Sequence, residues 1–123
     1  MAKIQTLEQE RAAFAWKKVN SVGSDRKEYK NLSKGAPALL MTNGLMQTLA
    51  FYNSRGREPA KLLAGHIQEW LKLKIADITD AGFEKVMADL QKCEPAVYMR
   101  ATDEALEILR WIRQFADALI KED

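Results

Sequence analysis

The chain has 123 residues, of which 47% are hydrophobic and 29% charged, and this predicts one soluble globular domain over residues 1–123. The single cysteine, Cys93, excludes an internal disulfide, and with the single histidine, His66, it supplies too few ligands for a Cys/His zinc site. The first residues contain no apolar signal run, so we expect a cytoplasmic protein.

The charges are unevenly distributed along the chain, although the net charge is only +2. Residues 11–74 hold twelve Lys/Arg and four Asp/Glu, whereas residues 75–123 hold six Lys/Arg and eleven Asp/Glu. This asymmetry permits binding of a polyanion by the basic part, or head-to-tail stacking of copies. Solvated helix faces with an accidental imbalance would look the same, so all three interpretations stay open.

The first predicted helix begins near Thr6 and ends at Gly23. Thr6 and Gln9 have the spacing of a capping box, and apolar residues follow at helical intervals. Trp16 fits the edge of the core. The alternative for Trp16 is a platform that stacks nucleic-acid bases, but such platforms usually group several aromatic residues.

A strongly basic second helix is predicted over residues 26–34, with Asp25 as its cap. Pro37 should then break or bend the chain, and Asn43 is the predicted cap of the next helix. Residues 37–56 form the most apolar and least charged part of the chain. We therefore predict that this stretch is buried and forms the core around which the other helices pack.

Three more helices follow. Pro59 opens the next one, in which His66 lies one position off the inner face and should therefore be a surface or half-buried residue. Thr79 or Asp80 should cap a short helix that ends at Cys93, itself expected as a small buried residue. The longest helix should run from residue 95 to about 121 with one continuous apolar stripe.

No segment shows the strict alternation of a strand, so the predicted fold is all-α, with about six helices in a single compact, bundle-like domain. No phosphate-binding glycine loop, metal-binding motif or nucleophile motif is present. We therefore expect no enzyme activity, no cofactor, no metal site and no small-molecule substrate. Acidic neighbours such as Asp103 and Glu104 point apart on a helix and do not share a proton.

Basic residues are the remaining candidates for function. The candidate nucleic-acid contacts are Lys17, Lys18, Arg26, Lys27, Arg100 and Arg113. The last two lie outside the apolar stripe of the last helix, so packing of the first helix against the last would merge these residues into one positive surface. Lys and Arg on helices contact phosphates without reading base sequence, and such binding weakens steeply with salt.

Several segments carry a resemblance to a known family. They are Gln5-Thr-Leu-Glu-Gln-Glu-Arg-Ala-Ala-Phe-Ala, the central Pro37-Ala-Leu-Leu-Met-Thr-Asn-Gly-Leu-Met-Gln-Thr-Leu-Ala-Phe51, and the tail from Tyr98 through Trp111 to Ala116. Together they resemble the small α-helical subunit of the Cmr complex, the type III-B CRISPR effector of antiviral defence. Met46 stands where the family more often has glycine, which implies local repacking.

The resemblance implies an all-helical, non-catalytic subunit. Its implied partners are other Cmr subunits and copies of itself, stacked along the duplex of guide RNA and target RNA, with no membrane. Base pairing carries the specificity in such systems, and protein contacts the backbone.

Two alternatives stay open beside this interpretation. One is a protein–protein spacer without RNA contact, whose charges, Glu104 and Glu107 among them, serve subunit stacking. The other is an uncharacterised nuclease or hydrolase, which predicts activity of the purified chain with a divalent metal.

Overall fold

The computed structural model describes residues 4–56 and 58–121, so Arg57 lies outside the described residues. The described residues contain no strand, which confirms the all-α prediction. They form six helices: α1 (Leu7–Ser21), α2 (Arg26–Asn43), α3 (Leu45–Ser54), α4 (Glu58–Lys74), α5 (Phe83–Lys92) and α6 (Pro95–Leu119). None of them combines the length and the apolar run that crossing a membrane requires.

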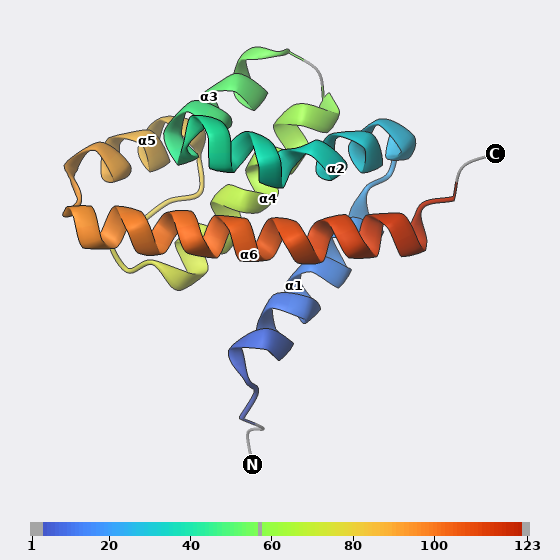
Figure 1. Cartoon of the computed structure of the whole chain (residues 1–123), viewed down its shortest axis with the longest axis horizontal. Helices are drawn as coiled ribbons and strands as arrows, with labels where there is room; N and C mark the ends of the chain where they lie inside the picture. Colours follow the sequence, from blue (N-terminus) through green and yellow to red (C-terminus); the bar gives the residue numbers. More distant parts are fainter. Residues whose placement is uncertain (1–3, 57, 122–123) are drawn as a thin grey trace.

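Helix α6 is the element against which most of the others pack. It stretches across the whole molecule and contacts α1, α2 and α4 (Figure 1). Its inner stripe matches the predicted one, and six of its residues are fully or almost fully buried: Ala101, Ala105, Ile108, Leu109, Ile112 and Ala116. Because half of these are alanines, neighbouring helices can approach α6 closely, and one connected core results.

The central apolar stretch is not the organising core that the sequence predicts. Its inward residues are buried, with Leu45 at 1% and Leu49 at 0% exposure, but Met41 is 71% and Phe51 43% exposed. The reason is geometric, because α2 and α3 lie at the outside of the molecule and a helix packed on one side buries only one stripe.

Of the break or bend predicted at Pro37, the break does not occur. Helix α2 continues through Pro37 to Asn43, because Ala36 and Leu40 on either side of the proline are buried against the core. The chain turns at Gly44 instead, where φ is 86°. Since side chains disfavour that conformation, Gly44 and not Asn43 separates α2 from α3.

The predicted helix caps are right for the first two helices and wrong later. The capping box of Thr6 and Gln9 is present, and Asp25 is the N-cap residue of α2, although its side chain makes no capping hydrogen bond. Helix α5 begins after Gly82 rather than at Thr79 or Asp80. Thr79 instead donates its backbone N–H to the carboxylate of Asp89 at 3.1 Å, so a contact within the tertiary structure holds this loop.

Candidate nucleic-acid interface

A hollow between α1 and the C-terminal part of α4 gathers basic residues. Its volume is about 320 Å³, and its lining is Phe14, Lys17, Lys18, Glu69, Lys72, Leu73 and Ala81. Three lysines therefore surround one glutamate. Of the predicted site residues, Lys17 and Lys18 lie here, and Lys72 is an addition that sequence reasoning missed because only packing brings α4 beside α1.

The three lysines of the hollow differ in how they are held. Lys18 forms an ion pair with Glu69 at 2.9 Å, and its Nζ lies 5.3 Å from the centre of the Phe14 ring. Lys17 and Lys72 are exposed. Three lysines and one glutamate therefore give the lining a net positive charge beside the Phe14 ring, a combination that suits a phosphate.

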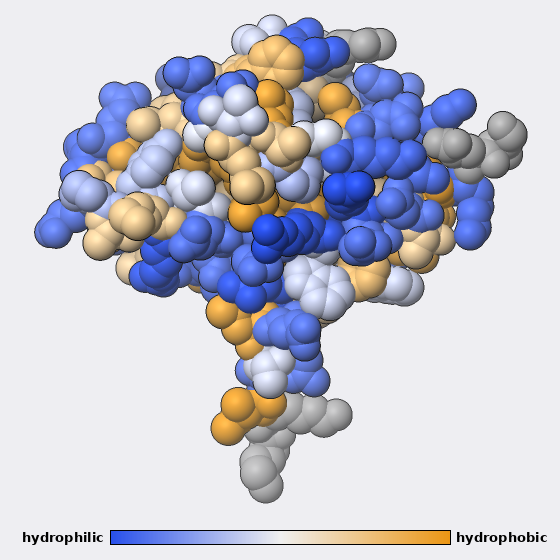
Figure 2. Space-filling view, viewed as in Figure 1, coloured by the Kyte–Doolittle hydropathy of each residue, from blue (hydrophilic) through white to orange (hydrophobic). Residues whose placement is uncertain are grey.

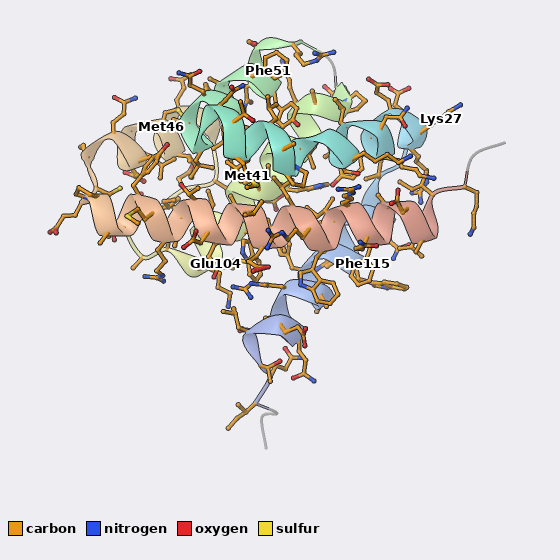
Figure 3. The ribbon with its side chains drawn as sticks, viewed as in Figure 1. Lys27, Met41, Met46, Phe51, Glu104 and Phe115 are labelled. Atoms are coloured by element: carbon orange, nitrogen blue, oxygen red, sulfur yellow. The ribbon has the colours of Figure 1, made fainter. Side chains whose placement is uncertain are left out.

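The predicted residues at the start of α2 are divided between solvent and the fold. Lys27 is exposed at one end of the molecule (Figure 3). Arg26 is half-buried and donates a hydrogen bond to the backbone carbonyl of Val22. Lys30, one turn further on, is buried, and its Nζ donates to the carbonyl of Ile120 at 3.0 Å. Part of the basic charge in this helix therefore holds neighbouring segments together.

The two predicted residues of α6 do not share one face of that helix. They are thirteen residues apart, which corresponds to about 20 Å along the axis and about 140° around it. Both arginines are exposed, and Arg100 also donates to the backbone carbonyl of Lys74 at 2.6 Å. The expected packing of α1 on α6 occurs, but these two arginines do not join one continuous stripe.

An internal ion pair lies at the crossing of α1 and α6. Glu104 is 9% exposed and pairs with Arg11 at 2.8 Å, and the indole N–H of Trp70 donates to the same carboxylate at 3.0 Å (Figure 3). Burial by itself would raise the pKa of Glu104, but the hydrogen bonds from Arg11 and Trp70 and the neighbouring positive charges outweigh it and lower the pKa. Glu104 is therefore not the exposed stacking contact that the spacer hypothesis requires.

Aromatic residues meet at the same crossing. Trp16 is 50% exposed, and its ring lies 5.2 Å from that of Phe115 in an edge-to-face arrangement. Trp111 lies 5.5 Å from Phe115. Trp16 therefore belongs to a group of three aromatic residues with Phe115 and Trp111, which the sequence did not reveal.

His66 is buried, which corrects the expectation of a surface or half-buried residue. It is 3% exposed, and its Nδ1 is hydrogen-bonded to the hydroxyl of Tyr29 at 2.8 Å. Burial lowers the pKa of His66 to about 4, so the ring is neutral at pH 7. The reason for the burial is that α2 packs over α4 and covers this position. Cys93, expected to be buried, is only half-buried.

Within residues 4–56 and 58–121, no group of three His, Cys, Asp or Glu side chains is placed to hold a metal ion.

Comparisons with known proteins agree with this fold. The model of the family described as CRISPR-associated protein (Cas_Cmr5) matches residues 7–119. The chain is 33% identical to the CRISPR system Cmr subunit Cmr5 of Thermus thermophilus over 97% of this chain and 100% of that one. It is 28% identical to the corresponding subunit of Thermotoga maritima, over 96% of this chain and 88% of that one.

The solved structures include a crystal structure of a Cmr5 family protein from Thermus thermophilus. It superposes with a TM-score of 0.82 at 31% identity and covers 96% of this chain and 100% of that one. The family match spans all six helices in the described part of the chain. The resemblance seen in the sequence is thus confirmed, and the chain belongs to the Cmr5 family of CRISPR-associated proteins, the small subunits of the Cmr complex.

Proposed function

We propose that this Cmr subunit is a non-catalytic component that stacks in copies along the guide–target duplex and binds the RNA backbone. The observation that carries the proposal is the hollow between α1 and α4, with Lys17 and Lys72 exposed beside the Lys18–Glu69 pair. Exposed ammonium groups on rigid helices neutralise phosphates without distinguishing bases. This suits a complex whose specificity comes from base pairing.

The other predicted residues act as further backbone contacts in this proposal. Lys27 and Arg113 are exposed and available to phosphates. Arg26 and Arg100 each donate one hydrogen bond inside the protein, and a guanidinium keeps further N–H groups for a second acceptor. Because single contacts are weak, the stacking of copies supplies the avidity.

The experiment that tests the proposal is a salt titration of RNA binding by the assembled complex. Replacing Lys17 and Lys72 by glutamine (Lys17→Gln, Lys72→Gln) should reduce the slope of log K against log salt by about 0.7–0.9 for each phosphate that a copy no longer neutralises. The matched control is Lys92→Gln, an exposed lysine on α5 outside the hollow. A slope that stays unchanged in a fully assembled complex would remove the claim of RNA contact.

The second candidate function is a protein–protein spacer that never touches RNA. The observation in its favour is that several basic groups are already used within the fold, as in the pair of Lys74 with Glu10 at 2.9 Å. Glu107 is the residue to substitute in a test of the spacer hypothesis, because it is only half-buried on α6, 3.8 Å from Arg110, whereas Glu104 is internal. Under the spacer hypothesis, Glu107→Lys abolishes assembly while RNA affinity per assembled complex stays constant.

A nuclease or hydrolase activity is tested separately on the purified chain with added divalent metal. Turnover by that sample at an enzyme-like rate would overturn the non-catalytic assignment.

A further inference from the structure

The outer side of α2 and α3 is exposed and carries no charge. No charged residue occurs between Lys34 and Arg55, yet many side chains of this stretch face solvent. We call this the uncharged surface, and its principal residues are Ala38, Met41, Thr42, Gln47, Ala50 and Phe51. On α3 the exposed residues follow the i, i+3, i+4 spacing of a single helical face.

The figures show where the uncharged surface lies. Mostly pale and orange residues cover the area from the C-terminal half of α2 up to α3 (Figure 2). Met41 lies on the front of α2 and Phe51 on α3 at the top of the same view (Figure 3). Exposures of 71% for Met41 and 43% for Phe51 leave two large apolar side chains partly in water.

Within its borders, this surface offers no cation to an RNA backbone. Its cations are limited to the borders, Lys34 on one side and Arg55 on the other, and Arg55 lies over the Phe51 ring at 5.3 Å. The basic hollow is formed by other helices, α1 and α4. Methionine and aromatic residues without charge, bordered by a polar rim, are the composition of the centre of a protein–protein interface.

A second copy of this chain does not fit the uncharged surface. Two copies joined through the same surface would form a closed pair, which cannot extend into a row along a duplex. A head-to-tail contact would join this surface to a different surface of the next copy, which would have to be uncharged and apolar as well. On other helices in the described part of the chain, the exposed Leu73 and Met99 each have a charge one turn away on the same helix face, Glu69 and Asp103 respectively.

We propose that the uncharged surface docks onto an uncharged, apolar surface of a different protein subunit of the Cmr complex. The exclusion of a second copy rests on the proposed function, whereas the docking itself rests on membership of the Cmr complex and on the absence of charge. Met41 and Phe51 are the apolar anchors of the contact, and Lys34 and Arg55 belong to its rim.

The experiment is reconstitution of the complete complex with Met41→Glu and Phe51→Glu variants of this subunit. A charge placed in an uncharged interface loses its hydration without gaining a partner, so incorporation should weaken at least tenfold for each variant. The matched control is Met99→Glu, a methionine of 67% exposure on α6 outside the surface, which should be incorporated like the wild type. Circular dichroism of each purified variant checks that the fold is retained. We expect wild-type helix content, because all three substituted side chains are exposed in the structure.

Incorporation of both Met41→Glu and Phe51→Glu at the wild-type level would overturn the proposal. Equal loss of the Met99→Glu control would overturn it too, because the effect would then not belong to this surface. Sedimentation of the purified chain tests the alternative that a second copy covers this surface. Self-association that Met41→Glu abolishes would assign the surface to a second copy and overturn the proposal. RNA binding is read out independently by the Lys17 and Lys72 variants, so the two proposals fail separately.

Discussion

Lowering the pH from 8 to 5 should destabilise the protein through one residue, His66. Its pKa is lowered to about 4 by burial, against an ordinary value of 6.5. Between these values the unfolded chain binds a proton that the folded chain refuses, so the free energy of unfolding decreases as the pH falls below 6.5. In the protonated ring both nitrogens are donors, so Nδ1 would have to donate to the Tyr29 hydroxyl 2.8 Å away.

The magnitude follows from the two pKa values. When the pH falls well below both pKa values, the shift of His66 lowers the free energy of unfolding by about 3 kcal/mol in total. About 2 kcal/mol of this stability is already lost at pH 5. The chain has one histidine, so no other imidazole contributes to the slope between pH 5 and 6.5. The carboxylates contribute mainly at lower pH.

Urea unfolding at several pH values between 5 and 8 measures this loss, and His66→Gln is the comparison. The variant should be less stable at pH 8 but should lose much less stability than the wild type between pH 6.5 and 5. Equal slopes for the two proteins would refute the assignment of the pH dependence to His66.

The other predictions concern the α1–α6 crossing and the turn between α2 and α3. Glu104→Ala leaves the part-buried Arg11 guanidinium and the Trp70 N–H without their acceptor, so the free energy of unfolding should fall by about 1–3 kcal/mol. A loss below about 0.5 kcal/mol in chemical denaturation would contradict a stabilising pair. Gly44→Ala places a side chain at a φ of 86° and should destabilise by about 1–3 kcal/mol. Its control is Gly65→Ala inside α4, where nothing lies within 4 Å of the new Cβ, so the melting temperature should stay or rise.

Local signals in the sequence predicted much of the secondary structure. The capping box at Thr6 and the inner stripe of α6 are decided by neighbours three or four residues apart, and both are present in the structure. Pro37 shows where local reasoning fails. Its intrinsic tendency to break a helix is overridden because Ala36 and Leu40 are buried on either side of it.

The candidate site divides in the same way. Lys17 and Lys18 are visible from charge alone, whereas Lys72 and Glu69 join them only because α4 passes beside α1. The ring partner of Trp16, Phe115, is about a hundred positions away in the chain, so the sequence does not show that these two aromatic residues meet.

The sequence by itself determined the helical class, the position of most helices, the uneven charge and the family resemblance, because these depend on spacing along the chain. The tertiary structure alone decided that His66 and Glu104 are internal and that Met41 and Phe51 are exposed. The physical reason is that periodicity identifies a face of a helix but not what covers it. Contacts between residues distant in sequence choose which apolar face is buried and which ionisable group lies beside a partner.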